Sequence, residues 1–347
     1  MQCVKFACVF IALAAQAQGA APVVDEALTA YVSTRDTVHL PDGRSIHIVC
    51  MGQGSPTVIL TAGLGDWSIS WSSVQSGIAK TSRVCAWDRP GFGLTDAASG
   101  SSSSATTEAN LEAALARGGI AAPYILVSHS MGSFESLLYA DRHPAAVAGM
   151  VLIDPTVPGQ SALLRRVAPL VAESSEAYTG MLVKLVRDCA VQIRQSTPAS
   201  AAGISPDCQI RFPDDFPPAV RQAVQKQALK PGQAEAVASF YENAALSSEQ
   251  VVNPRRSYAD LPLIVLTATK VQSQPGETSD AAAQNRQFAA EFNLAHDQIA
   301  ALSSRGINSR VPGTGHYIHQ EKPQVVIDAV NQVISAARAG RRSNAAR

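Results

Sequence analysis

The chain has 347 residues, and its 46% apolar and 16% charged residues exclude a disordered or fibrous protein because they can fill a sizeable core. Lys and Arg together number 28, as do Asp and Glu, so no net charge draws the chain to nucleic acid or to an anionic membrane. The one basic cluster spans residues 338–347, and we expect residues 341–347 to form a disordered tail.

The N-terminal segment is typical of a secretory signal peptide. An apolar run follows Lys5, and Ala15-Gln16-Ala17 matches a signal-peptidase pattern, although cleavage after Gly19 or Ala21 also fits. The run is shorter than the ~20 residues of a membrane-spanning helix, which argues against stable membrane insertion. We therefore expect residues 1–21 to be removed and the mature protein to be secreted or periplasmic.

Beyond this segment the chain keeps an even number of cysteines. An oxidising compartment favours two disulfides between them, for which three pairings are possible, and four free buried thiols are the alternative. The cysteines concerned are Cys50, Cys85, Cys189 and Cys208.

The first part of the mature chain carries strand patterns that end in glycine-rich loops. A hairpin pattern covers 37–50, strand patterns cover 57–61 and 83–87, and a helix pattern covers 106–117. The loops at 62–65 and 89–93 directly follow the second and third of these patterns. This alternation predicts an α/β protein.

The hydrophobic pattern changes from that of a strand to that of a helix around Ser130. Residues 124–127 are apolar and suit a buried strand, and the helical pattern resumes at 133–140. Between them, Ser128-His129-Ser130-Met131-Gly132 is a Gly-x-Ser-x-Gly elbow with serine in place of the first glycine. A serine on so tight a turn holds its hydroxyl clear of the sheet, in the position of a nucleophile.

The second part of the chain interrupts the strand patterns and then resumes them. After a strand that ends at Asp154-Pro155, residues 156–261 carry amphipathic helical patterns broken by Pro- and Gly-rich loops. Strand patterns return at 263–267 and 307–311, with a long helix expected over 280–302 and a last one from Pro323.

In this order of motifs, from the loop Asp88-Arg-Pro-Gly-Phe-Gly93 through the elbow to Gly315-His316, the chain resembles the α/β-hydrolase fold family. It is similar to secreted or periplasmic serine hydrolases that carry a helical cap. The resemblance implies a mostly parallel eight-stranded sheet flanked by helices, with the core at 22–155 and 262–340. Residues 156–261 would form the inserted cap, or lid.

The family's chemistry requires a serine, a histidine base and a carboxylate. The resemblance assigns these roles to Ser130 and to His316, which follows the last strand. His319 is the rival base, but we expect it to be a surface residue. His129, in the variable position of the elbow, is expected to be buried and structural.

The acid of the triad has two candidate locations. Most relatives place it after the seventh strand, where the first available acids are Glu277 and Asp280. Some take it from the end of the sixth strand, which here is Asp154. Both strand ends lie on the same edge of the sheet, and we favour Asp154.

The resemblance also implies an oxyanion hole and a disulfide pattern. The hole would consist of the backbone N–H groups of Leu64 and Met131, although Ala62 stands where relatives often have histidine. Because the second strand runs antiparallel beside the fourth in this fold, Cys50–Cys85 is the first expected disulfide. The second, Cys189–Cys208, would tie a cap helix to the Pro-rich loop after it.

The predicted function is hydrolysis of an ester or related acyl bond of a small-molecule substrate through an acyl-enzyme. A peptidase, carbon–carbon hydrolase, acyltransferase or lyase would use the same triad, and a binding protein that has lost catalysis is a further alternative. Serine rather than aspartate at the elbow argues against epoxide or haloalkane hydrolysis. No metal or cofactor is implied, because the sequence carries no phosphate loop and no regular spacing of metal ligands.

Overall fold

The computed structural model describes residues 28–33, 37–98, 100–196, 204–209, 216–271 and 278–345. The expected signal peptide at 1–21 and Glu277 lie outside the described residues. Within these ranges, the chain builds an eight-stranded sheet in the order β1-β2-β4-β3-β5-β6-β7-β8. The strands are β1 (Thr37–His39), β2 (Ser45–Met51), β3 (Thr57–Thr61), β4 (Val84–Trp87), β5 (Tyr124–His129), β6 (Val147–Ile153), β7 (Leu263–Ala268) and β8 (Gly306–Val311).

The sheet is mostly parallel, as the sequence predicts. Only the β1–β2 and β2–β4 pairs are antiparallel, and every pairing from β4 to β8 is parallel. β3 and β5 are buried along their whole length, which fits their position in the middle of a sheet covered on both faces. The carboxyl ends of the parallel strands therefore meet at one edge, where this type of sheet binds ligands.

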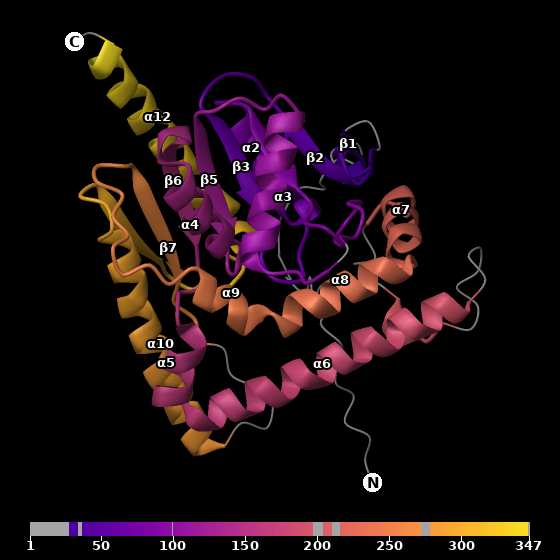
Figure 1. The fold of residues 1–347 in the computed structure, drawn as a ribbon. Helices are drawn as coiled ribbons and strands as arrows, with labels where there is room; N and C mark the ends of the chain where they lie inside the picture. The colour runs from indigo at the N-terminus through magenta and orange to yellow at the C-terminus, as the bar shows by residue number, and fades with distance from the viewer. Residues whose placement is uncertain are drawn as a thin grey trace.

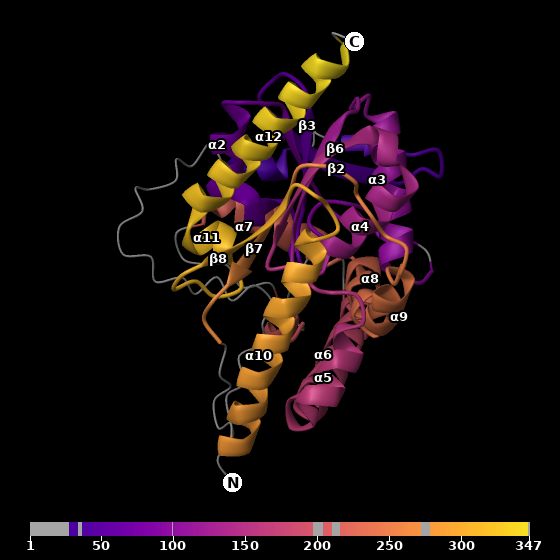
Figure 2. The same cartoon turned by 90° about the vertical axis from the view of Figure 1, so that its left-hand side faces the viewer.

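Helices cover both faces of the sheet. Apolar side chains of α2 and α12 pack on one face and those of α3 and α10 on the other, and Figure 2 shows α12 and α3 on opposite sides of the strands. The helices outside the segment between β6 and β7 are α2 (Ser72–Ala79), α3 (Ser104–Arg117), α4 (Gly132–Arg142), α10 (Ser279–Ala300), α11 (Ile318–Glu321) and α12 (Pro323–Ala345). Short 3₁₀ turns occur at η1 (Ala30–Val32), η2 (Ser68–Trp71), η3 (Pro144–Ala146) and η4 (Pro206–Cys208).

Between β6 and β7 the described residues form helices and no strand. These helices are α5 (Gln160–Val167), α6 (Pro169–Gln195), α7 (Pro218–Ala228), α8 (Pro231–Glu242) and α9 (Ala244–Gln250). Figure 1 shows α6 and α8 running alongside each other below the sheet. Within the described ranges, no helix is both long and apolar enough to cross a membrane.

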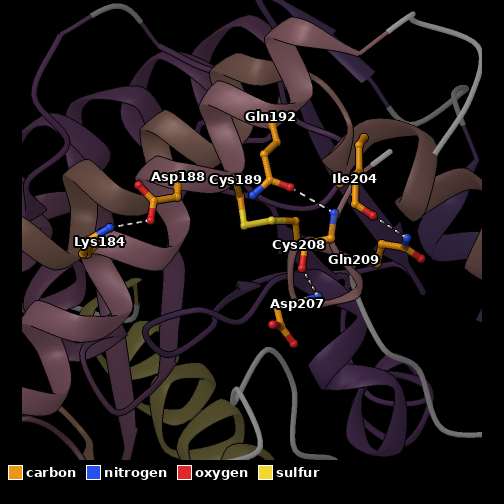
Figure 3. The surroundings of a disulfide bond; sticks show 9 residues. Lys184, Asp188, Cys189, Gln192, Ile204, Asp207, Cys208 and Gln209 are labelled. Atoms are coloured by element: carbon orange, nitrogen blue, oxygen red, sulfur yellow. Dashed lines mark hydrogen bonds and ion pairs between the residues drawn. A yellow bond between two sulfur atoms is a disulfide. The ribbon is translucent and has the colours of Figure 1, made fainter. Parts of the chain in front are cut away.

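Both expected disulfides are present. Cys50 of β2 lies directly opposite Cys85 of β4 in the antiparallel register, and the two are bonded. Cys189, near the end of α6, is bonded to Cys208 of η4, as Figure 3 shows. The second bond closes a loop within the helical segment.

The C-terminus differs from the expectation of a disordered tail at 341–347. Helix α12 continues to Ala345, so the backbone of 341–345 is helical, whereas 346–347 lie outside the described residues. The physical reason is local composition: alanine and arginine, both strong helix formers, dominate residues 336–342, and no proline stops the helix.

Candidate active site

Ser130 occupies a strained turn between β5 and α4. Its backbone lies in the left-handed region, with φ of 52°, which is uncommon for a residue other than glycine. The turn is held by three backbone hydrogen bonds of 3.0 Å: Ser130 N–H donates to Ile153, and the Ser130 carbonyl accepts from Ser133 and Thr156. The sheet and the next helix thus fix the serine at the carboxyl edge.

The loop after β3 packs directly against this turn because both contain glycine. A Cβ atom at Gly132 would lie 2.5 Å from the carbonyl oxygen of Ala62. A Cβ at Gly63 would lie 2.8 Å from Nδ1 of His129 and 3.3 Å from Cβ of Ser130. Real side chains do not tolerate such approaches, so the elbow and the loop require glycine at these positions.

The two predicted oxyanion donors flank this contact. Leu64 follows Gly63 in the loop, and Met131 follows Ser130 in the turn. In the part of the chain that the structure describes, the recorded hydrogen bonds give neither backbone N–H an acceptor. Both N–H groups therefore remain available to a ligand oxygen beside the serine.

A buried arginine forms hydrogen bonds to the loop after β3. Arg89 donates from Nη1 to the Gly63 carbonyl at 3.1 Å and from Nη2 to the Ala62 carbonyl at 2.6 Å. Its Nε donates to Glu135 of α4 at 2.5 Å, which balances the charge inside the protein. Arg89 therefore ties the loop after β3 to the helix that follows the elbow.

The structure brings His316 and Asp154 together. Nδ1 of His316 and Oδ2 of Asp154 are 2.6 Å apart, and the other carboxylate oxygen accepts from the Ala268 N–H at 2.9 Å. The His316 side chain is 30% exposed and that of Asp154 is 11% exposed, so the imidazole is reachable while its partner is shielded. Asp154, like Ser130, has a positive φ, of 42°.

The other candidates for the acid are placed differently. Asp280 lies exposed in the first turn of α10, where its carboxylate contacts the hydroxyl of Ser279 at 3.5 Å. Glu277 lies outside the described residues. Among the described acids, Asp154 is the one bonded to the imidazole of His316.

His129 connects the serine turn to the loop that carries His316. Its Nε2 lies 3.0 Å from the backbone carbonyl oxygen of His316, and the two rings are 4.5 Å apart. Because a carbonyl only accepts, Nε2 must carry the proton and Nδ1 must be bare. His129 is buried, as predicted, and burial and then the charge of His316 lower its pKa well below the usual value.

His319 is also buried, so the expectation that it lies at the surface is wrong. It is 0% exposed, with its ring 4.7 Å from that of Trp71 and 4.6 Å from that of His129. The short helix α11 turns it inward, and the Ser73 hydroxyl donates to its backbone carbonyl at 2.7 Å. Burial, and secondly the charge of His316, lower the pKa of His319 to about 3.

Sequence reasoning missed Asp66. This acid follows the loop after β3, and its Oδ2 lies buried 4.0 Å from Nδ1 of His129, too far for a hydrogen bond. Burial raises the pKa of Asp66 to about 6, with the charges of His316 and Arg89 opposing the rise. No sequence signal marks it, because an acid after a glycine loop is ordinarily a solvated turn residue.

A mostly apolar cavity of about 80 Å³ adjoins the loop after β3. It lies between the loops at 65–67 and 91–93 on one side and helices α6, α7 and α8 on the other. Its lining includes Trp67, Phe92, Val186, Val224, Ala234 and the Cys189–Cys208 disulfide. The helical segment between β6 and β7 thus supplies one wall of this space.

Comparisons with known proteins agree on the fold. Residues 56–183 match the family model described as alpha/beta hydrolase fold. The mouse (Mus musculus) sn-1-specific diacylglycerol lipase ABHD11 is 23% identical over 221 residues, covering 61% of this chain and 59% of that protein. The chain spans less than two thirds of the length of each curated relative that it matches.

Solved structures extend the likeness over most of the chain. A thermophilic esterase from Thermogutta terrifontis superposes with a TM-score of 0.54 at 18% identity, covering 87% of this chain and 98% of the esterase. The epoxide hydrolase CorEH superposes with a TM-score of 0.57 at 17% identity, covering 86% and 98%. At such identities the likeness concerns the fold alone.

Proposed function

Because this chain has the α/β-hydrolase fold, we propose that it is a serine hydrolase that cleaves an ester or related acyl bond of a small-molecule substrate. The observation that carries the proposal is the 2.6 Å contact between His316 and Asp154, at the sheet edge where Ser130 occupies its strained turn. An imidazole whose Nδ1–H donates to a carboxylate presents a bare Nε2, which is the state that a general base requires.

In the proposed reaction, His316 Nε2 takes the proton of the Ser130 hydroxyl while Oγ attacks the acyl carbon. The N–H groups of Leu64 and Met131 stabilise the oxyanion, and Asp154 stabilises the imidazolium. The tetrahedral intermediate expels the alcohol, which takes the proton from His316. Water then attacks the acyl-enzyme by the same route and releases the acid.

Other reactions of the fold fit less well. Epoxide and haloalkane hydrolysis use a carboxylate nucleophile at the elbow, and here the elbow residue is Ser130. The diacylglycerol lipase among the curated relatives supports ester chemistry. Peptidase, carbon–carbon hydrolase, acyltransferase and lyase activities share the triad and are the alternatives that a substrate screen separates.

We assign substrate choice to the cap at 156–261, inserted into a core of 22–155 and 262–340. The cavity of about 80 Å³ beneath it is roughly half the size of a site of about 150 Å³ that binds benzene, so it suits an apolar group of a few carbons. Filling it with Ala234→Phe should lower turnover of butyryl esters more than that of acetyl esters. If Ala234→Phe leaves the relative turnover of acetyl and butyryl esters unchanged, the cap does not determine substrate choice.

We further propose that the mature protein acts outside the cytoplasm. The support is the signal-peptide pattern at 1–21 and the two disulfides, which persist in oxidising compartments. Fractionation of the native host, with the N-terminus of the exported form sequenced, tests this. An intact residue 1–21 segment in a cytoplasmic fraction would contradict it.

The test of the activity is turnover of short nitrophenyl esters by purified protein. Wild type should show saturable hydrolysis, and Ser130→Ala should lose it while remaining folded. Ser335→Ala, an exposed serine on α12, is the matched control and should behave as wild type. If Ser130→Ala retains wild-type turnover, the nucleophile assignment is wrong, and if wild type hydrolyses no ester or related acyl substrate, the proposed activity is wrong.

A further inference from the structure

A second cluster of potential metal ligands lies away from the elbow, where α3 meets the end of α4. Glu108 and Glu112 are one turn apart on α3, and His143 directly follows α4. Nε2 of His143 is 3.6 Å from Oε1 of Glu108 and 3.6 Å from Oε1 of Glu112. All three atoms lie within 4.8 Å of one another, and no ion is present.

Two of these atoms are buried and lack a hydrogen-bond partner within the described part of the chain. Among the described residues, neither Oε1 of Glu108 nor Nε2 of His143 has a hydrogen-bond partner, and both are shielded from solvent. The Glu108 side chain is 0% exposed, and a separation of 3.6 Å is too long for a hydrogen bond. Leaving a buried carboxylate oxygen unsatisfied is costly, so these atoms call for a ligand between them.

The two separations from His143 to the carboxylates fit a small cation with tetrahedral coordination. Metal–ligand bonds of about 2.1 Å at the tetrahedral angle place neighbouring ligand atoms about 3.4 Å apart, close to the two separations of 3.6 Å seen here. The charge of Glu112 and the part of the Glu108 charge that Arg142 does not offset face the cation. An imidazole ligand favours zinc and related metals over magnesium or calcium. The Glu112 side, 51% exposed, leaves the fourth position open to water.

The surroundings supply the outer support that such sites use. Arg142 binds the other carboxylate oxygen of Glu108, which leaves Oε1 free and fixes its direction. His143 is the first residue after α4, and its ring lies 4.6 Å from the ring of Tyr139 on that helix. The arrangement matches a ligating carboxylate that is itself hydrogen-bonded.

We propose that Glu108, Glu112 and His143 bind one divalent transition-metal ion, with Zn²⁺ as the best match, at a site separate from the triad. Helix α4 has 11 residues, so about 16 Å separates its end from the elbow. The ion would join α3 to the far end of the helix that follows Ser130. Its effect is therefore expected on stability and not on the chemical step.

The experiment uses Zn²⁺ alone with the chelator-treated full-length protein. Calorimetric titration should give one Zn²⁺ per chain, and Zn²⁺ should raise Tm in a saturable way that Mg²⁺ does not reproduce. Co²⁺ in the same site should show the strong visible absorption of tetrahedral coordination. Ester turnover should not change when the metal is removed, so this proposal and the proposed function can fail independently.

His143→Ala and Glu112→Gln should each weaken Zn²⁺ binding by at least about tenfold, and Glu112→Gln should fold normally because its side chain is half exposed. His39→Gln, which removes an exposed histidine elsewhere, is the matched control and should bind as wild type. Failure of wild type to bind Zn²⁺, or equal binding by His143→Ala, would overturn the proposal and leave the cluster as an ion-pair group.

Discussion

Histidine and aspartate side chains on the two sides of the His316 loop differ in solvent exposure and in hydrogen bonding. On the solvent side, the His316–Asp154 pair is partly exposed and hydrogen-bonded. On the protein side, Asp66, His129 and His319 are buried, and four of their side-chain nitrogen and oxygen atoms lack partners among the described residues.

This difference assigns different chemistry to identical residue types. Burial lowers the pKa values of His129 and His319, so both rings remain neutral at neutral pH. Neither competes for the proton, and neither can reach a substrate from a fully buried position. A usable base needs an orienting carboxylate and an open side, and in this comparison the His316–Asp154 pair has both.

The largest effect is expected when the carboxylate of the His316–Asp154 pair is removed. Asp154→Asn should lower kcat by about 10⁴-fold with the fold intact, because the imidazole loses the partner that fixes its tautomer and stabilises its charge. Steady-state kinetics with a nitrophenyl ester and circular dichroism measure both effects. Asp280→Asn is the control and should behave as wild type, whereas near-normal turnover in folded Asp154→Asn would move the acid to the loop after β7.

Replacing the buried acid Asp66 should instead increase the stability of the protein. Since the pKa of Asp66 is raised from 3.8 to about 6, the folded state binds its proton more tightly than the unfolded state. The contribution of Asp66 to stability is therefore full below about pH 4 and is lost as the pH rises through about 6. Asp66→Asn should gain about 2–3 kcal/mol of unfolding free energy over wild type at pH 7.

Urea denaturation at pH 4 and at pH 7 separates this effect from general packing. The gain of Asp66→Asn should be present at pH 7 and nearly absent at pH 4, where the wild-type carboxyl is protonated. Asp280→Asn, at an exposed position, should show no difference between the two conditions. A gain of equal size at both values would mean that the charge of Asp66 is not its origin.

The smallest effect on rate is expected at His319. His319→Phe keeps an aromatic ring against Trp71 and removes two nitrogens that have no partner among the described residues. Turnover should stay within about tenfold of wild type, since this ring cannot act as the base, whereas His316→Phe should be inactive. If folded His319→Phe loses as much activity as His316→Phe, the claim that only His316 can act as the base is wrong.

The exposed pair could be anticipated from the sequence and the buried cluster could not. Parallel strands bring their carboxyl ends to one edge, so Asp154 at the end of β6 and His316 in the loop after β8 were both expected there. The burial of His319 depends on how α11 packs against Trp71, which is about 250 positions earlier in the chain. No local pattern encodes that contact, just as none places Asp66 beside His129.

The same limit applies to the ends of elements and to the helical segment. Periodicity predicted the amphipathic stretch around Cys189, but the extent of α6, Pro169–Gln195, also depends on its packing against α5, α8 and α10. The disulfide Cys50–Cys85 was accessible because the expected fold places β2 beside β4, and Cys189–Cys208 because the two cysteines are only 19 positions apart. The catalytic roles of Ser130, His316 and Asp154 stay predictions.

The most direct test of the central claim is the position at which a fluorophosphonate probe bonds to the protein. The account predicts one adduct per chain, mapped by peptide mass spectrometry to Ser130, blocked by prior incubation with an ester substrate and absent in Ser130→Ala. An adduct on another residue, or unlabelled wild-type protein that nevertheless hydrolyses esters, would contradict it.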